Sequence, residues 1–343
     1  ALIDLLRSGF VEPIIPPALP YHILAQQIMA IALQMGGVGR SEWYEQIAEV
    51  NGFSAMEPSK RNEVFQWMLS ENILAEDSGI IWLGEVGESE FGRRNFMELF
   101  SVFTSPRVFK VLQGRRELGS VDISTFFSRE DGPRILLLGG RAWRVTHLDW
   151  NRRLAYVETV ELRGKSRWQG DGQGLSYQFA QQIQAILALD DVRPWWSKRA
   201  AERLEEIRFG YPWLHANGTA CVPGTGALEW WTFAGKAANQ SLAGALSELL
   251  SERCTSDDLH IRYPLASDME QFERGIRAIK EMPVTDIVPL IDDKAIEGLK
   301  FSECLPQLRA IEMLQSRLTD RPALQATLNK EVRVLPTGAN QET

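Results

Sequence analysis

A tryptophan lies between two arginines in the segment Arg141-Ala142-Trp143-Arg144. Alternate side chains of a β-strand share a face, so a strand here would present Arg141 and Trp143 together and Arg144 on the opposite side. An indole beside guanidinium groups suits single-stranded nucleic acid, because bases stack on the ring while the cations bind phosphates. The segment therefore indicates a strand-binding site, with packing of Trp143 in the core of a small barrel as the alternative.

Other cations surround this tryptophan in the sequence. Residues 93–167 contain 15 lysines and arginines against 8 acidic residues, a net charge of +7 in a chain whose total is -8. Such a local excess favours a polyanionic partner although the chain as a whole is acidic. For any single arginine, a solvated surface position is the alternative. The arginines expected to bind phosphates, besides Arg141 and Arg144, are Arg94, Arg115, Arg116, Arg152 and Arg153.

Motifs for catalysis are missing from the sequence. Residues 233–237 contain the Gly-Lys pair of a nucleotide-binding loop but lack its first glycine and its magnesium-binding hydroxyl. The four histidines match no zinc-ligand spacing, and no GxSxG motif occurs. We therefore predict no catalytic residue, no metal and no cofactor in this chain. A hydrolase that uses Asp149 or Glu158 is an alternative, although nothing in the sequence pairs these carboxylates.

The composition is that of a globular protein, with 44% hydrophobic and 24% charged residues. No apolar run is long enough to span a membrane, and Asp4 and Arg7 interrupt the apolar start, so we expect neither a membrane segment nor a signal peptide. Three widely separated cysteines form no metal pair and no disulfide framework, which favours the reducing cytoplasm. A first residue of alanine instead of methionine suggests a piece of a longer protein.

The 343 residues predict an α+β protein of two or three domains. Residues 1–20 contain four prolines towards their end and are expected to form an extended connector. Residues 21–90 show three helical patterns and a hairpin, the order of a winged-helix domain. Residues 91–170 are rich in short strands and predict a small β-barrel or rolled sheet. Residues 171–335 predict a mixed α/β part, and residues 336–343 a frayed tail.

Charge also separates these regions. Residues 41–90 carry 11 acidic residues against Lys60 and Arg61, so we expect the winged helix to be a spacer or a protein contact and not a reader of DNA grooves. In the strand-rich region the expected strands are 96–103, 108–112, 117–122, 134–138, 142–148 and 154–161. In the last region the expected helices are 175–189, 197–209, 238–250, 268–280 and 305–318, and the expected strands are 228–233 and 259–263.

A series of motifs resembles part of a known helicase family when their order is considered. The motifs occupy residues 96–103 (FMELFSVF), 111–114 (VLQG), 118–122 (LGSVD), 137–145 (LLGGRAWRV), 168–171 (WQGD), 232–239 (TFAGKAAN) and 300–306 (KFSECLP). From about Leu2 to Leu318, the chain resembles the C-terminal region that follows the two motor lobes of large helicase-related (Lhr-like) DEAD/DEAH-box helicases.

The resemblance implies a winged helix followed by a β-barrel-containing domain, both packed on two RecA-like motor lobes that this chain lacks. Members of the family are ATP-dependent helicases that translocate mainly 3′ to 5′ on DNA and are linked to DNA repair. The family's strand-contacting tryptophan, in the pattern LGxxxWR, matches Trp143. Binding of ATP and magnesium and hydrolase activity are therefore implied for a longer parent protein and not for this chain.

Two functions remain open at this stage. In the first, the chain guides single-stranded DNA for motor lobes of the same polypeptide. Trp143 then stacks on a base and resists backward movement of the DNA while the lobes step. In the second, the chain is a protein-interaction module whose acidic winged helix and helical tail bind the motor lobes or another factor, without affinity for nucleic acid. Retention of a labelled oligonucleotide at low salt distinguishes the two.

Overall fold

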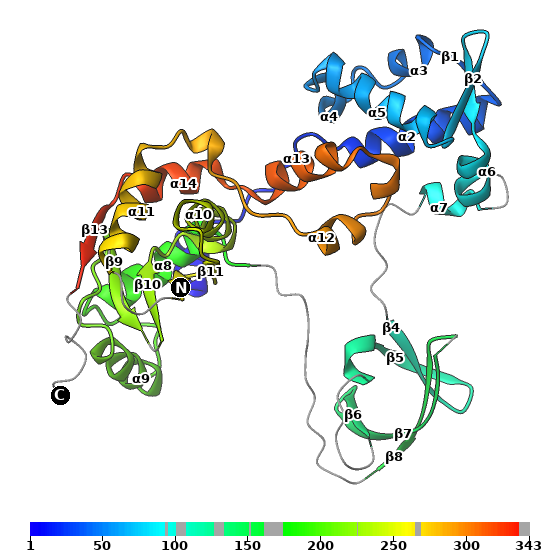
Figure 1. The fold of residues 1–343 in the computed structure, drawn as a ribbon. Coiled ribbons are helices and arrows are strands. Elements are labelled where there is room, and N and C mark those ends of the chain that lie inside the picture. The colour runs from blue at the N-terminus through cyan, green and yellow to red at the C-terminus, as the bar shows by residue number, and fades with distance from the viewer. Residues whose placement is uncertain are drawn as a thin grey trace. The chain divides into compact units, whose positions relative to one another are not determined.

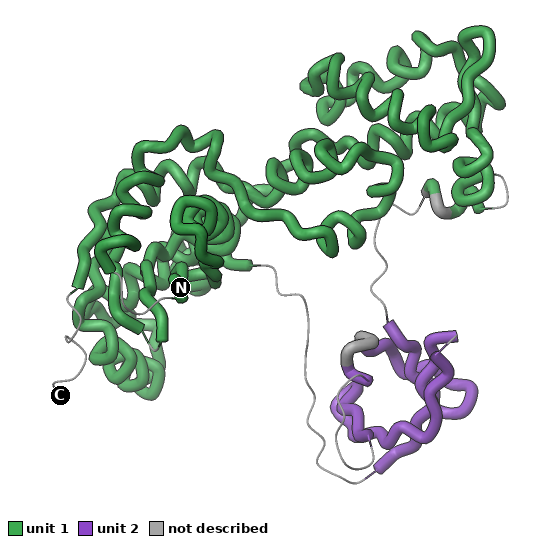
Figure 2. Tube along the Cα trace, in the orientation of Figure 1, with its two compact units in different colours: residues 1–100, 174–343 green, residues 101–173 purple. Residues whose placement is uncertain are grey.

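The protein is seen in a computed structural model that describes residues 1–92, 95–100, 108–126, 134–150, 152–160, 174–224, 226–264 and 269–335. The chain forms two compact units (Figure 2). Unit 1 combines residues 1–100 and 174–343, and unit 2 consists of residues 101–173, so unit 2 is inserted in the sequence of unit 1. Helices and three sheets together make a mixed α/β structure. The predicted tail 336–343 lies outside the described residues.

The N-terminal segment starts with a helix. The extended connector predicted for residues 1–20 is wrong over α1 (Leu2–Arg7), because the first proline follows only at Pro13. Residues 10–17, which include the prolines up to Pro17, have no regular secondary structure, as expected. Helix α1 is held by Trp195, whose Nε1 donates a hydrogen bond of 3.0 Å to Asp4 Oδ1.

The first core of unit 1 lies among helices and a small sheet. The three helices and the hairpin predicted for residues 21–90 are present, with the second helix divided into two short ones. A further strand joins the hairpin, and the antiparallel order is β1-β3-β2. The elements are α2 (Tyr21–Met35), β1 (Val38–Gly39), α3 (Glu42–Glu45), α4 (Asn51–Ser54), α5 (Pro58–Ser70), β2 (Leu74–Asp77), β3 (Ile80–Leu83), α6 (Glu85–Phe91) and α7 (Met97–Phe100).

Helix α2 is the centre of this first core. Its apolar residues recur at helical spacing, and Leu24 and Ile28 are fully buried. Gly36 ends the helix with a φ of 70°, a left-handed conformation that glycine adopts without strain. Helix α13 (Gln307–Leu318), from the other end of the sequence, packs on α2 and contributes Met313 to the same core. The first core is therefore completed by residues that follow unit 2 in the chain.

The second core of unit 1 is built on a five-stranded sheet of order β11-β12-β10-β9-β13. All its neighbouring strands are antiparallel except β13, which runs parallel to β9. Trp230 of β10, Leu242 of α10 and Phe272 of α11 are fully buried together. The elements are α8 (Tyr177–Ala188), α9 (Lys198–Phe209), β9 (Gly218–Gly224), β10 (Ala227–Trp231), α10 (Gly235–Leu250), β11 (Thr255–Ser256), β12 (His260–Tyr263), α11 (Met269–Glu281), the short 3-10 helices Val284–Asp286 and Ser302–Cys304, α12 (Asp293–Glu297), α14 (Arg321–Leu328) and β13 (Glu331–Val334).

The five helices predicted in this part are confirmed, as α8, α9, α10, α11 and α13. The two predicted strands are confirmed as β10 and β12. Strands β9, β11 and β13 and helices α12 and α14 were not predicted.

Unit 2 is a single curled sheet of order β5-β4-β8-β7-β6 (Figure 1). Strands β4 and β8 run parallel, and the other neighbours are antiparallel. Among the described residues β5 and β6 are the two edges, so the sheet is a curled half-barrel, which agrees with the predicted rolled sheet and not with the closed barrel given beside it. The elements are β4 (Val108–Gln113), β5 (Arg116–Asp122), the 3-10 helix Ile123–Phe126, β6 (Ile135–Leu138), β7 (Arg141–Asp149) and β8 (Leu154–Thr159).

The first predicted strand of this region, 96–103, is wrong over residues 97–100, which form helix α7. Leu99 is buried in the first core, and its carbonyl oxygen accepts a hydrogen bond of 2.6 Å from Gln26 Nε2 on α2. A short apolar run suits a strand or a buried helix equally well, and here the contact with α2 accompanies the helical form. Residues 101–103 lie outside the described part of the chain.

Candidate nucleic-acid interface

Trp143 lies in the core of unit 2. Its side chain is 5% exposed and packs with Phe109, Leu136 and Val157. The indole Nε1 donates a hydrogen bond of 2.9 Å to the carbonyl oxygen of Leu138. This position is the packing alternative that the sequence left open. Stacking on a base would require the indole to leave this core.

Arg144 lies on the opposite face of β7, as strand alternation predicts. It is paired across the strands with Glu158 of β8, and its Nε donates a hydrogen bond of 2.9 Å to Glu158 Oε1. Both side chains are about half exposed. Because Glu158 already neutralises this guanidinium, Arg144 offers a phosphate less than a free arginine would.

Three of the predicted arginines gather at one end of the curled sheet. Arg115 and Arg116 are exposed at the turn between β4 and β5, and Arg141 is exposed where β7 begins. The curl brings the two edges of the sheet together near this end: a Cβ added at Gly119 of β5 would lie 3.5 Å from a methyl carbon of Leu138 on β6. The edge contact thus places cations from two different turns at the same end of unit 2.

Two further predicted cations, Arg152 and Arg153, lie at the opposite end, in the turn between β7 and β8. Arg152 and Arg153 are exposed there, and Arg153 adopts a left-handed φ of 54°. Trp150, in the same turn, is 47% exposed and packs edge-on against Phe109, with ring centroids 5.1 Å apart. The Arg152 guanidinium reaches Asp149 only at 4.0 Å and is 78% exposed. This turn therefore presents an indole and two guanidiniums together.

The sequence favours packing for Trp150, and the ring does pack on Phe109, but the half-exposed position was not predicted although a signal for it is present. An aromatic residue followed within three positions by two arginines stands in a turn between two predicted strands. Side chains in a hairpin turn are not obliged to join the core, unlike alternate residues of the strands. The two basic ends of unit 2 are separated by the six residues of β4, a length of roughly 20 Å. Arg94 lies outside the described residues.

Unit 1 offers no nucleotide loop at the Gly-Lys pair. The backbone N–H of Gly235 donates to the Asp258 carbonyl oxygen at 3.0 Å, and that of Lys236 to the Leu175 carbonyl oxygen at 2.9 Å. These amides are the groups with which a phosphate-binding loop holds its ligand, and here they are used within the fold. Through these hydrogen bonds, Gly235 and Lys236 join the start of α10 to the segment before α8 and to the loop that contains Asp258.

The described residues contain no group of three side chains suited to a metal ion. Asp149 and Glu158, considered for a hydrolase, lie towards opposite ends of the β7–β8 pair, where Asp149 faces Leu154 and Glu158 faces Arg144. Burial raises the pKa of the Cys254 thiol to about 11 and that of Cys304 to about 12, so neither is a thiolate near neutral pH. The described side chains therefore bring no acid–base pair or nucleophile together at these positions.

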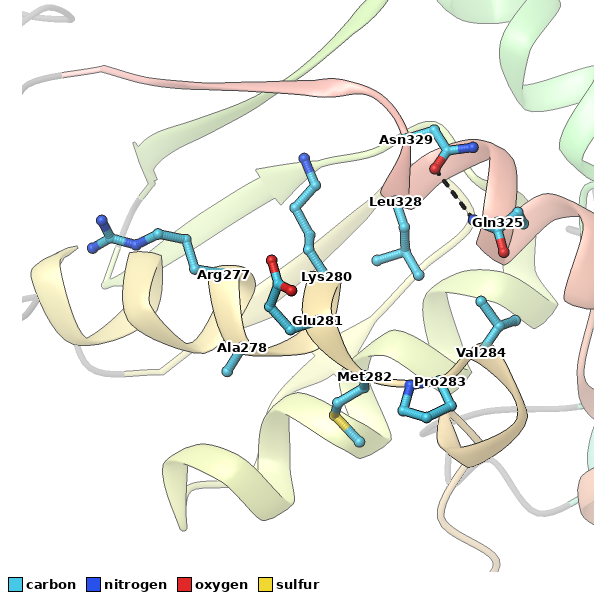
Figure 3. Close-up of a pocket in the computed structure, with 10 residues that line it drawn as sticks. All are labelled: Arg277, Ala278, Lys280, Glu281, Met282, Pro283, Val284, Gln325, Leu328 and Asn329. Carbon is cyan, nitrogen blue, oxygen red and sulfur yellow. Dashed lines mark hydrogen bonds between the residues drawn. The ribbon is translucent and has the colours of Figure 1, made fainter.

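One pocket in unit 1 is lined by none of the residues predicted as a site (Figure 3). It encloses about 720 Å³ between the end of α11 and helix α14. Arg277, Lys280 and Glu281 line it from α11, and Gln325 and Asn329 from the α14 side are joined by a hydrogen bond of 3.2 Å. The lining mixes both charges with amides and shows no catalytic geometry.

Comparison with known protein families and with curated proteins finds no match to this sequence. A solved structure does share its fold. The chain aligns over 98% of its length with 48% of the Mycobacterium smegmatis helicase Lhr, in a structure bound to ssDNA and AMP-PNP, at 13% identity and a TM-score of 0.54. The DUF1998 helicase MrfA, in a structure bound to DNA, aligns with 77% of this chain and 36% of its own at 13% identity, but its TM-score of 0.26 is too low to carry an argument.

The chain therefore has the fold of about half of the Lhr helicase structure and spans about half of that protein's length. At this level of identity the similarity establishes the fold and transfers no residue role. Within the described residues, no helix is both long and apolar enough to cross a lipid bilayer.

Proposed function

We propose that this chain is an accessory region of an ATP-dependent DNA helicase and that its unit 2 binds the single strand. The observation that carries the proposal is the concentration of cations in unit 2 of an acidic chain. Its described residues include eight lysines and arginines against four acidic residues, while the whole chain has a net charge of -8. The shared fold with a helicase solved in complex with ssDNA supports the same reading.

The two basic ends of the curled sheet suggest how single-stranded DNA is bound. Phosphates bind Arg152 and Arg153 at one end and Arg115, Arg116 and Arg141 at the other, because these guanidiniums are exposed. Trp150 stacks on a base at the first end, since its indole is half exposed beside two cations. In this proposal Trp143 stabilises the curled sheet as part of its core. It does not contact DNA unless the core opens.

Movement along the strand is assigned to motor lobes that precede this chain in a longer polypeptide. Those lobes bind ATP and magnesium and step 3′ to 5′, and unit 2 resists backward slipping of the strand between steps. The acidic residues of 41–90 make a winged-helix domain there a spacer or a contact with the motor and not a second DNA site.

Fluorescence anisotropy with a labelled oligothymidylate tests the proposal on the 343-residue chain. We expect binding at low salt that weakens steeply as salt rises, because each phosphate contact releases condensed counterions. Arg152→Ala and Arg153→Ala together should weaken binding, whereas Arg199→Ala, an exposed arginine on α9 of unit 1, should not. Absence of binding at low salt would refute the proposal and favour the protein-interaction function.

A further inference from the structure

Strand β13 is an edge of the second sheet of unit 1. It pairs with β9 alone among the described residues, and Figure 1 shows it at the outer side of this sheet. An unpaired strand edge is a template for another strand, because its amides and carbonyls lack partners. Native proteins usually prevent other strands from pairing with such an edge. The residues of β13 therefore have to be considered as a candidate pairing site.

The direction of the unpaired groups follows from the ladder with β9. Leu335 donates its N–H to the Cys221 carbonyl oxygen at 3.0 Å, so Leu335 faces β9. Backbone groups of a strand point to alternate sides, and therefore Arg333 and Glu331 also face β9. The N–H and C=O groups of Val332 and Val334 then point to the open edge.

The side chains beside this edge form a groove with an apolar floor. A pocket of about 290 Å³ lies between α11 and β13, lined by Ile276, Val332 and Val334 and rimmed by charged residues. Val332 is half-buried against the second core, but Val334 is 38% exposed. The apolar layer of the sheet therefore continues to the edge and stops there uncovered by the described residues.

The sequence of β13 is complementary to itself. In an antiparallel pair about a twofold axis at Val332, Val332 faces its own copy, Glu331 faces Arg333 of the second chain, and Arg333 faces Glu331 of that chain. Val332 is also the residue whose backbone groups point outwards, so this register gives a hydrogen-bonded pair at the axis. Charge and hydrogen-bond direction thus agree on one register.

Within the described part of the chain, neither charged residue of β13 is paired with an opposite charge. Among the described residues, Glu331 has no basic partner, and Arg333 contacts only the imidazole of His215 through one of its five N–H groups. Glu273 and Arg277, one turn apart on α11, line the same groove, and a twofold axis would reverse their order in the second copy.

We propose that β13 pairs antiparallel with β13 of a second copy of this chain, which joins two five-stranded sheets into one. The pairing sets Val332 against its own copy and forms two Glu331–Arg333 contacts between the chains. This inference goes beyond the binding of single-stranded DNA by unit 2 and does not depend on it.

Measurement of the molar mass of the 343-residue chain by light scattering across a concentration series tests the pairing. We expect a dimer that dissociates on dilution, and a shift towards monomer for Glu331→Arg, which would face Arg333 of the second chain. The double variant Glu331→Arg with Arg333→Glu restores opposite charges and should restore the dimer. Glu248→Arg, an exposed residue of α10, serves as the matched control and should leave the mass unchanged.

Cysteine cross-linking tests the register itself. Facing residues of an antiparallel pair have Cα atoms about 4.5–5.5 Å apart, within disulfide range. Chains with Glu331→Cys and chains with Arg333→Cys should cross-link when mixed, and neither should cross-link with itself, because identical positions are offset by two residues. The three native cysteines are buried and should not react.

A chain that stays monomeric at every concentration would overturn the proposal. So would a dimer that the single variants Glu331→Arg and Arg333→Glu, each tested alone, both leave intact. Hydrogen exchange shows whether something other than a second copy covers the edge of β13. If the Val332 and Val334 amides exchange slowly in a monomer, a different segment covers β13. This result too would refute pairing between copies.

Discussion

Trp143 and Leu138 are joined by a hydrogen bond of 2.9 Å that spans the turn between β6 and β7. Gly139 and Gly140 make this turn, with φ of 60° and 74°, a conformation in which both central residues are left-handed. The bond ties the indole to the hairpin that carries it. Trp143 therefore helps to fix the register between β6 and β7.

Trp143→Ala is predicted to destabilise unit 2 by about 3–5 kcal/mol, the range for removal of a large buried aromatic side chain. The physical cause is the cavity left among Phe109, Leu136 and Val157, together with loss of the hydrogen bond from the indole to the Leu138 carbonyl oxygen. Thermal or denaturant unfolding monitored by circular dichroism measures the loss. Unchanged stability with weaker oligonucleotide binding would instead favour the stacking role that the sequence suggested for Trp143.

Trp150→Ala is predicted to keep the fold and weaken binding of an oligothymidylate by about 5- to 150-fold, the equivalent of about 1–3 kcal/mol for one stacked base. The indole packs edge-on against Phe109 but remains 47% exposed, so its loss opens no closed cavity. Anisotropy titration measures the affinity, and Trp150→Phe should retain most of it. An unchanged dissociation constant for Trp150→Ala would rule out stacking in this turn.

Arg152→Ala is predicted to lower the slope of log affinity against log salt by about 0.7, the value for one phosphate contact to a single strand. Arg144→Ala should change the slope less, because Arg144 is already paired with Glu158. Titrations at several salt concentrations measure both slopes. Equal decreases for the two variants would show that Glu158 does not shield Arg144 from the strand.

The stability of the first core is predicted to fall as the pH falls from about 6.5 to about 4. Burial, with a smaller contribution from Arg317, lowers the pKa of His22 from 6.5 to about 4. In this interval the unfolded chain binds a proton that the folded chain does not, so the free energy of unfolding decreases by up to about 3 kcal/mol. His22→Gln should flatten the pH profile of unfolding in this window, and His147→Gln, an exposed histidine of unit 2, should not.

Gly235→Ala is predicted to destabilise unit 1 by more than about 2 kcal/mol. Gly235 has a φ of 78°, and a Cβ there would lie 2.6 Å from the Leu175 carbonyl oxygen, which belongs to the backbone and cannot turn away. Gly226→Ala is the control, because Gly226 has a similar φ of 71° but nothing within 4 Å of its Cβ position. Similar denaturation midpoints for the two variants would contradict the clash.

Local pattern was enough to predict the five longer helices of residues 174–335, α8, α9, α10, α11 and α13, but not the shorter α12 and α14. Helix α9 shows why: Ser197 stands just before it, and its side chain accepts a hydrogen bond of 3.2 Å from the Ala200 N–H. Strands β9 and β13 could not be predicted in the same way. They pair across more than 100 residues of sequence, and β9 contains Pro223 and two glycines, which weaken any strand pattern.

The candidate interface was predicted in part for a similar reason. Strand alternation correctly separated Trp143 from Arg144, but only the other strands decide which face is covered, and Phe109 and Val157 cover the face of Trp143. The partner of Arg144 is set by the register of β7 and β8, which contains an irregularity between Val145 and His147. The high content of arginine was a property of the sequence, but its division between two ends of a sheet was not.

The insertion of unit 2 has a consequence for synthesis of the protein. Tyr21 hydrogen-bonds Glu312 across 291 positions, and α2 packs on α13, so the first core needs residues that are synthesised only after unit 2. Every strand pair of unit 2 joins residues between 108 and 159. Unit 2 should thus be able to fold on the ribosome while residues 21–100 still await their partner, and the nascent N-terminal segment is where we expect chaperones to act.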